Sequence, residues 1–144
     1  MDIIIRLADN SDLPDILKLL AAYDLPAAGV EQHINNFFVA TQDGKIVGTI
    51  GLEVYGHSGF LRSAAVHLNF QNKGIGTKLF NTLITYAKSL SLSDIFLLTN
   101  SAEEYFADKG FEMIKREEVA TEVLNSEEFK DACPATAVCM YFKI

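Results

Sequence analysis

The chain has 144 residues, of which 49% are hydrophobic, and this is enough for one domain with a substantial buried core. Its formal net charge of −7 argues against a general nucleic-acid surface, because such surfaces attract phosphate with Lys and Arg. No apolar run is long enough to span a membrane, and the first residues lack the basic segment of a secretion signal. We therefore expect a cytoplasmic protein without a nucleic-acid or membrane partner.

The first third of the chain predicts a strand, two helices and a second strand. A β-branched run at 3–7 favours a strand, and the acidic and polar residues of 9–12 are suited to capping a helix. That helix carries apolar residues at helical spacing and ends before Leu25 to Gly29. A short helix then leads into a strand at 38–41.

An Asp-Gly pair at Asp43 and Gly44 predicts a hairpin turn before a long strand over 46–55. Period-two spacing divides this strand into two faces, of which one holds Ile46, Gly48, Ile50, Leu52 and Val54. After a second turn, the chain returns as a strand over 60–67. This return brings Arg62 near Glu53 and Tyr55 on the neighbouring strand.

The centre of the sequence predicts a helix that begins near Gly74 after a strand. Apolar and polar residues from 75 to 88 separate onto two helix faces, so the helix packs on a sheet. A helix start carries unpaired N–H groups and a partial positive charge, and it attracts anions such as phosphate. Gly74 and Gly76 let an anion approach the main chain, and their spacing from Gln71 matches neither a Walker loop nor a dinucleotide fingerprint.

The remaining elements complete a mixed α/β fold in a single domain, residues 1–144. An apolar run at 94–100 predicts a buried strand. Ser101 to Glu104 are expected to cap a short helix that ends at Gly110. We expect further strands at 111–115 and 135–142, and a helix at 119–132.

Metal and thiol sites find little support in the sequence. Cys133 and Cys139 have neither redox-pair nor zinc-knuckle spacing, so we expect free thiols, and the role of Cys133 stays open. The three histidines are far apart in the sequence. We therefore expect no metal site.

The stretch from Leu61 to Thr77 resembles the splayed strand and the Q/R-x-x-G-x-G/A loop of the GNAT superfamily of N-acetyltransferases. The stretch from Leu98 to Phe111 is similar to the family's strand-helix-Gly-Phe segment. The acetyltransferase domain of N-acetylglutamate synthases has a similar sequence in this segment. More similar still, over nearly the whole chain, are the small acetyltransferases linked to arsenic-resistance operons. The resemblance implies the GNAT acyl-CoA N-acyltransferase fold, a mixed central sheet flanked by helices.

The resemblance also implies which residues bind acetyl-CoA (coenzyme A), the expected co-substrate. They are Ala65, Val66, His67, Gln71, Asn72, Lys73, Gly74, Ile75, Gly76, Thr77, Asn100 and Phe106. The backbone N–H of Val66 would stabilise the oxyanion of the reacting thioester. Many relatives carry a tyrosine where this chain has Phe106, so the general acid is unassigned. Tyr105 is adjacent but is expected to point about 100° away.

Three residues are candidates for the acceptor side. Glu53 is our candidate base, with a solvated surface carboxylate as the competing interpretation. Arg62 suits a substrate carboxylate, and a surface salt bridge with Glu53 is the alternative. That pairing would lower the pKa of Glu53 and make it a poor base. Tyr55 either lines the wall of the cleft or packs in the core.

Together these features predict an N-acetyltransferase that acts on the amine of a small molecule. An amino acid or an amino-acid-like toxin such as an arsenical is the expected acceptor. A noncatalytic acyl-CoA-binding sensor or interaction module on the same fold is an alternative, as is a peptide or protein N-acetyltransferase. The sequence leaves the acceptor's identity and the subunit count open, a homodimer being one arrangement.

Overall fold

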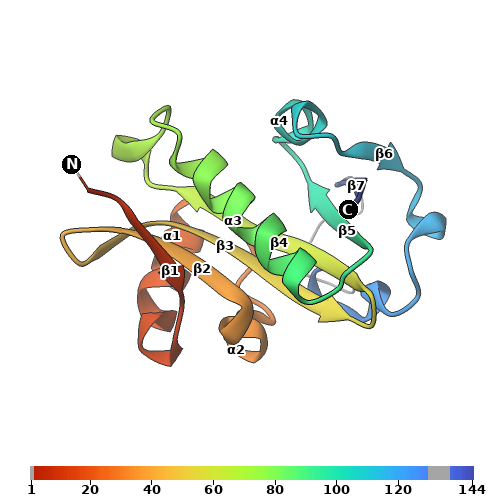
Figure 1. Cartoon of the computed structure of the whole chain (residues 1–144), viewed down its shortest axis with the longest axis horizontal. Coiled ribbons are helices and arrows are strands. Elements are labelled where there is room, and N and C mark those ends of the chain that lie inside the picture. The colour runs from red at the N-terminus through yellow and green to blue at the C-terminus, as the bar shows by residue number, and fades with distance from the viewer. Residues whose placement is uncertain (1, 130–136) are drawn as a thin grey trace.

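The computed structural model describes residues 2–129 and 137–144 and contains one seven-stranded sheet in the order β1-β2-β3-β4-β5-β7-β6 (Figure 1). The strands are β1 (Ile4–Leu7), β2 (Phe37–Gln42), β3 (Lys45–Tyr55), β4 (Ser58–Val66), β5 (Asp94–Thr99), β6 (Glu112–Ile114) and β7 (Val138–Lys143). The helices are α1 (Leu13–Ala22), α2 (Val30–His33), α3 (Ile75–Ser89) and α4 (Glu103–Asp108). This is the predicted mixed α/β class.

Helices cover both faces of the sheet (Figure 1). The buried face of α3, which includes Leu79 and Leu83, packs with Leu52 of β3 and Ile95 of β5 in the largest core cluster. On the other face, Ile16 and other residues of α1 pack in a second cluster with apolar residues of α2 and β2. The two faces therefore present different surroundings to any side chain of β3 and β4.

The two halves of the sheet meet at β4 and β5, which are parallel. These strands pair only from Ser58 to Phe60, opposite Asp94 to Phe96. Beyond Phe60, β4 continues as far as Val66, and no strand of the described residues pairs with it on that side. The sheet is therefore open along the last part of β4.

A β-bulge interrupts the pairing of β3 with β4. Ala65 lies opposite Thr49 and Arg62 lies opposite Gly51, so two residues of β4 face one residue of β3. Ser63, one of the two, has a positive φ of 58°. Bulges redirect side chains and are frequent beside active sites. Here the bulge separates Arg62 from the residues at the end of the strand.

The period-two prediction for β3 is confirmed for most of the strand. Ile50, Leu52 and Val54 all pack in the cluster with α3. Ile46 is an exception, because it packs in the cluster with α1 while Val47 packs with α3. The cause is a second irregularity, between Ala40 and Thr41 of β2, which shifts the register opposite Ile46.

The capping prediction is confirmed in part at the start of the chain and is wrong before α4. Asp9 accepts a hydrogen bond from the N–H of Ser11 and forms a capping box with Asp12, and this box caps the 3-10 turn Asn10–Asp12 that leads into α1. The N-cap residue of α1 itself, Asp12, makes no side-chain capping bond to that helix. Before α4 the N-cap residue is Ala102, and its N–H donates to Thr99 Oγ1 at 2.9 Å, so Thr99 supplies the oxygen expected from Ser101.

The helix predicted at 119–132 is also wrong over its described part. Residues 119–129 form turns, a short 3-10 helix (Val123–Asn125) and the beginning of one helical turn. Val119 and Val123 are buried, and their spacing of four residues is the same as that of residues on one face of a helix. Cys133 and residues 130–132 lie outside the described residues.

Within residues 2–129 and 137–144, none of the helices has the length and apolar character needed to cross a membrane. In the same residues, no group of three or more His, Cys, Asp or Glu side chains is arranged to hold a metal ion.

Candidate active site

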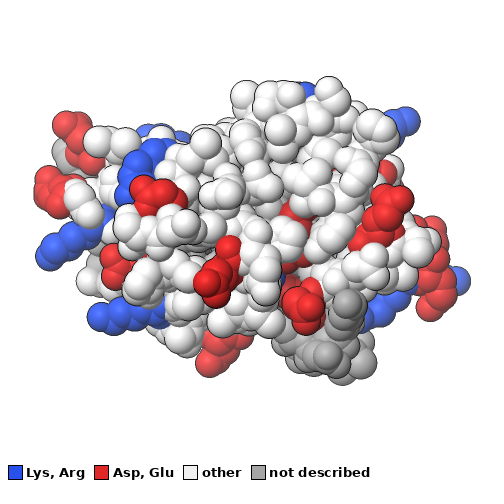
Figure 2. Space-filling view, turned by 90° about the horizontal axis from the view of Figure 1, so that it is seen from below, with Lys and Arg blue, Asp and Glu red and all other residues white. Residues whose placement is uncertain are grey.

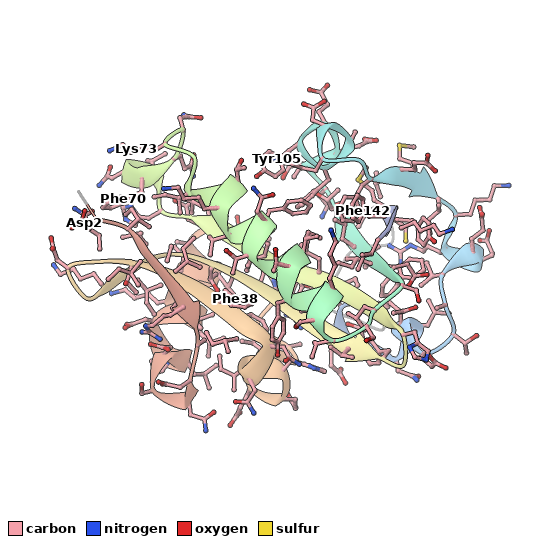
Figure 3. All side chains as sticks on the ribbon, viewed as in Figure 1. Asp2, Phe38, Phe70, Lys73, Tyr105 and Phe142 are labelled. Carbon is pink, nitrogen blue, oxygen red and sulfur yellow. The ribbon has the colours of Figure 1, made fainter. Side chains whose placement is uncertain are left out.

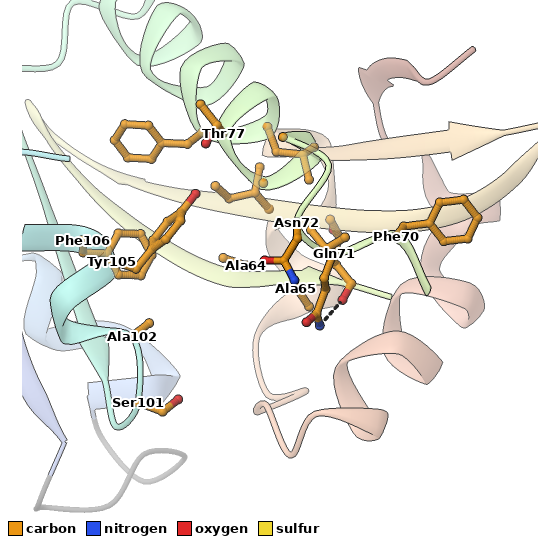
Figure 4. Close-up of a pocket in the computed structure, with 17 residues that line it drawn as sticks. Ala64, Ala65, Phe70, Gln71, Asn72, Thr77, Ser101, Ala102, Tyr105 and Phe106 are labelled. Atoms are coloured by element: carbon orange, nitrogen blue, oxygen red, sulfur yellow. Dashed lines mark hydrogen bonds between the residues drawn. The ribbon is translucent and has the colours of Figure 1, made fainter. Parts of the chain in front are cut away.

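A cavity of about 650 Å³ lies between the start of α3, the open end of β4 and helix α4 (Figure 4). One wall contains Phe70, Gln71, Asn72 and Gly74 of the loop before α3, and the opposite wall contains Tyr105 and Phe106 of α4. Its floor includes Ile50 of β3. The cavity therefore fills the opening left where β4 and β5 separate.

The start of α3 presents free backbone N–H groups to this cavity. Gly74 is the N-cap residue with a φ of 82°, and no side chain caps the helix. The first bond of the helix joins the N–H of Lys78 to the carbonyl of Gly74 at 3.1 Å. Hence the N–H groups of Ile75, Gly76 and Thr77 have no partner within the helix. A Cβ built on Gly74 would meet no atom within 4 Å, so the space beside Gly74 is open.

The open edge of β4 supplies a further N–H group. The N–H of His67 donates to the carbonyl of Val47 on β3 at 2.8 Å. Because successive peptide groups of a strand point to opposite sides, both backbone polar groups of Val66 point away from β3 and toward the opening. The carbonyl of Val66 accepts a hydrogen bond from Gln71 Nε2 at 2.9 Å, which agrees with this direction (Figure 4).

Helix α4 places two aromatic residues in the cavity, and this corrects the expectation that Tyr105 points away from it. Phe106 is buried and Tyr105 is 41% exposed, but both line the cavity (Figure 4). The hydroxyl of Tyr105 lies 3.3 Å from where a Cβ on Gly76 would stand. Tyr105 therefore reaches across toward α3 (Figure 3). Its hydroxyl faces the helix start, where the free N–H groups lie.

Most of the cofactor-binding residues predicted from the sequence meet in this cavity. Those that line it are Ala65, Val66, Gln71, Asn72, Gly74, Gly76, Thr77 and Phe106. His67, Lys73, Ile75 and Asn100 are absent from the lining. Ile75 is buried in the core, so it can contribute only its N–H.

Sequence reasoning missed several lining residues, which are Thr49, Ile50, Ala64, Phe70, Leu79, Phe80, Ser101, Ala102 and Tyr105. Leu79 and Phe80 belong to the predicted apolar face of the helix, and their position one turn after the Gly-rich start was the available signal. Thr49 and Ile50 gave no such signal, because they reach the cavity only through the pairing of β3 with β4.

The acceptor candidates form a separate, buried charged cluster. Arg62 Nη1 donates to Glu53 Oε2 at 2.8 Å, and the two side chains are 0% and 1% exposed. The hydroxyl of Tyr55 donates to the other oxygen, Glu53 Oε1, and His33 Nε2 lies 3.7 Å from that atom. The predicted proximity is thus confirmed. The salt bridge is buried, and the surface alternatives for Glu53 and Arg62 are wrong.

The guanidinium of Arg62 also binds the loop between α1 and α2. Its Nη1 donates to the carbonyl of Ala28 at 2.6 Å, and its Nη2 donates to the carbonyl of Pro26 at 2.9 Å. A second carboxylate, Glu128, lies 3.5 Å from Nη2. These three partners come from distant segments, and no sequence pattern pointed to them.

Burial governs the protonation of this cluster. It raises the pKa of the Glu128 carboxyl to about 7, with Arg62 acting in the opposite direction and Glu53 adding to the rise. Burial, followed by the hydrogen bond to Glu53, also raises the pKa of Tyr55, so its hydroxyl stays a donor. Both oxygens of Glu53 already accept hydrogen bonds, and this arrangement suits a positioning role better than proton abstraction.

The cavity and the charged cluster lie at successive parts of β4, on either side of the bulge at Ser63. Arg62 reaches the loop between α1 and α2, whereas Ala64 to Val66 line the cavity beside α3. Figure 2 shows the molecule from the α1 and α2 side, where Lys and Arg stand apart from one another and acidic atoms are visible at the floor of a hollow.

Comparison with known proteins agrees with this geometry. The model of the family described as the acetyltransferase (GNAT) family matches residues 8–115. An amino-acid acetyltransferase of Mycobacterium tuberculosis is 30% identical over 132 residues, covering 85% of this chain and 75% of the relative. An amino-acid acetyltransferase of Neisseria meningitidis is 28% identical over 126 residues, covering 80% of this chain but 28% of the relative. The chain thus spans about a quarter of the length of the latter.

Among solved structures, a Mycobacterium tuberculosis protein in complex with CoA and NLQ has a TM-score of 0.82 and 27% identity. The match covers 98% of this chain and 99% of the other.

Proposed function

Because the chain belongs to the acetyltransferase (GNAT) family, we propose that it transfers an acetyl group from acetyl-CoA to the amine of a small molecule that carries a carboxylate. An amino acid or an amino-acid analogue is the proposed acceptor, and the cytoplasm is the proposed location. The observation that carries the proposal is the cavity that joins the free N–H groups of α3 to the free N–H of Val66.

The residues at the start of α3 fit the diphosphate of coenzyme A. The N–H groups of Ile75, Gly76 and Thr77 are unpaired within the helix, and the space beside Gly74 is open to the cavity. The positive end of the helix dipole favours an anion at this position. In a chain with a net charge of −7, such a local backbone site attracts phosphate without a basic surface.

The open edge of β4 fits the rest of the coenzyme and the reacting group. Bound acetyl-CoA supplies a thioester whose carbonyl oxygen gains negative charge in the transition state. The N–H of Val66 points toward the opening and is suited to donate to that oxygen. Holding the amine beside the carbonyl provides much of the remaining acceleration.

The charged cluster fits an acceptor with a carboxylate. Arg62 is a fixed guanidinium in a dry setting, and such groups bind carboxylates strongly. Glu53 holds Arg62 in place, and water is the proposed acceptor of the amine's proton. No hydroxyl stands at Phe106, so solvent protonates the departing thiolate, whose ordinary pKa of about 8.5 makes it a good leaving group.

The test is an acceptor screen that detects free thiol released from acetyl-CoA. The panel includes glutamate, glutamine, phosphinic analogues and an amino-acid-like arsenical, the last because the sequence resembles the acetyltransferases of arsenic-resistance operons. Release that requires an acceptor with both an amine and a carboxylate supports the proposal. Activity on amines without a carboxylate contradicts the acceptor class.

A second candidate is a noncatalytic acyl-CoA sensor. It is favoured by the apolar Phe106 and by the direction of Tyr105, whose hydroxyl faces Gly76. In the same screen, a sensor binds coenzyme A tightly and releases no thiol with any amine.

A further inference from the structure

Every N–H group of the Arg62 guanidinium already has a partner. Its Nε donates to Ser63 Oγ at 3.0 Å, and its Nη1 donates to the carbonyl of Ala28 and to Glu53 Oε2. Its Nη2 donates to the carbonyl of Pro26 and lies 3.5 Å from Glu128 Oε1. A guanidinium has five N–H donors, so an incoming carboxylate must replace one of these partners.

Glu128 is the partner that is held least. Its contact with Arg62, at 3.5 Å, is longer than an ordinary hydrogen bond, whereas the other four are between 2.6 and 3.0 Å. Glu53 is fixed in the sheet and by the hydroxyl of Tyr55. The carbonyls of Pro26 and Ala28 are main-chain groups. By contrast, the Glu128 carboxylate belongs to a side chain outside the sheet, at the beginning of a single helical turn.

The charges around Glu128 also favour its departure. Arg62 faces two carboxylates. Burial opposes ionisation of Glu128 most strongly, Arg62 favours it, and the neighbouring Glu53 of β3 opposes it further. Other polar groups also contact this cluster. Tyr55 and His33 of α2 face Glu53, and the hydroxyl of Ser126 accepts a hydrogen bond from the N–H of Glu128. Two carboxyl groups thus share one guanidinium. Near neutral pH the Glu128 carboxyl readily takes a proton and loses its attraction to Arg62.

We propose that Glu128 determines acceptor specificity, because its carboxylate occupies on Arg62 the place that the carboxylate of the acceptor takes. This inference rests on the proposed function and deepens it. An acceptor without a carboxylate or a similar oxyanion cannot replace Glu128 on the guanidinium and is therefore excluded.

The competition has a defined pH dependence. Below the pKa of Glu128 its carboxyl is neutral, and the acceptor meets a weak competitor. Above that pKa the ionised carboxylate must take up a proton before it yields, which weakens acceptor binding about tenfold per pH unit. Binding above neutral pH is therefore accompanied by proton uptake.

The experiment measures the binding of L-glutamate to the CoA-saturated protein by calorimetry at pH 6, 7 and 8, in two buffers of different ionisation enthalpy. For the wild type we expect binding to weaken about fivefold between pH 7 and pH 8, because a carboxyl with a pKa of about 7 is already half ionised at pH 7, with proton uptake at pH 8. Glu128→Gln should bind about tenfold more tightly than the wild type at pH 8 and lose both effects. Glu127→Gln, a change at the exposed neighbouring residue, should behave as the wild type.

The inference is overturned if Glu128→Gln retains the wild-type affinity and pH dependence, or if L-glutamate binds neither protein. KM and kcat provide a second readout, because Glu128→Gln should lower the KM of the acceptor at pH 8 and leave kcat unchanged. Failure of the proposed function has a different signature, namely L-glutamate binding without thiol release from acetyl-CoA by any acceptor.

Discussion

The cofactor cavity and the charged cluster are built on opposite principles, although one strand serves both. The cavity is open and relies on main-chain N–H groups at the start of α3 and at Val66. The cluster is closed and relies on side chains, with Arg62 and Glu53 almost fully buried. A backbone site depends on the fold and tolerates changes of side chain, whereas a buried charged site depends on each residue that neutralises it.

The largest expected effect is loss of stability on removing the central cation. Arg62→Ala leaves two buried carboxylates without their cation, and breaking a buried pair this way costs about 3–5 kcal/mol. Arg6→Ala is the matched control, because Arg6 pairs with Asp12 while 41% of its side chain is exposed, and such pairs contribute about 0–1 kcal/mol. Chemical denaturation measures both. Equal losses would mean that burial does not distinguish the two pairs.

Next in size is the effect of removing the N–H of Val66. Val66→Pro should lower kcat by about 10²–10³, as expected for loss of one oxyanion donor. The fold should persist, because this N–H points away from β3 and makes no ladder bond. Steady-state kinetics and circular dichroism measure these effects. Val66→Ala, which retains the N–H, is the control, and similar kcat values for the two variants would remove Val66 from the mechanism.

The third prediction concerns the charged cluster: the stability of Glu128→Gln relative to the wild type should depend on pH. The wild-type carboxyl has its pKa raised from 4.5 to about 7. Its contribution to the free energy of unfolding is fully present below pH 4.5 and is lost as pH rises through 7. We therefore expect Glu128→Gln to gain stability relative to the wild type over this interval, by up to about 3 kcal/mol. Denaturation at pH 5 and pH 8 tests this, and a constant difference between the two proteins would contradict it.

A smaller effect isolates the backbone site. Gly74 lies at the cavity and has a φ of 82°, and Gly44 lies in the β2–β3 hairpin and has a φ of 80°. A Cβ added at either residue would meet no other atom within 4 Å. Alanine at each should cost about 1–2 kcal/mol of stability from the left-handed conformation alone. Only Gly74→Ala should also weaken coenzyme A binding, by about tenfold, or about 1.4 kcal/mol. Calorimetry that finds equal affinities for the two variants would argue against the anion site.

The smallest effect is expected from Tyr105→Phe. The hydroxyl faces the start of α3, so its loss should weaken coenzyme A binding by less than about threefold, typical of one exposed hydrogen bond, and should leave kcat unchanged. A large fall in kcat, with its basic pH limb altered, would instead identify Tyr105 as the general acid.

Local patterns in the sequence predicted those parts of the molecule that depend on local geometry. The glycines before α3, the Asp-Gly hairpin and the alternation in β3 all reflect constraints within a few residues. The closeness of Arg62 to Glu53 followed from hairpin pairing. Their burial did not, because it depends on the carbonyls of Pro26 and Ala28 and on Glu128, which arrive from distant parts of the chain.

Errors arose where tertiary packing replaced a local rule. Val119 and Val123 have helical spacing, but they fill a cluster with Phe60 and Phe96 from a segment of turns. Tyr105 was expected to point away from the cavity because of its angle on the helix. Helix α4 instead lies along the cavity wall, and the adjacent Tyr105 and Phe106 both reach the cavity.

Three residue pairs, Ser58 to Phe60 with Asp94 to Phe96, are the only ladder joining the first four strands to the last three among the described residues. The sheet thus consists of two parts, called here the two lobes, that are joined by a short ladder and share the core beneath α3. An extended ligand arm lying along the rest of β4 would act as a substitute strand between them. Occupancy should then slow amide exchange in both lobes together, so that the coenzyme also serves as a structural member of the sheet.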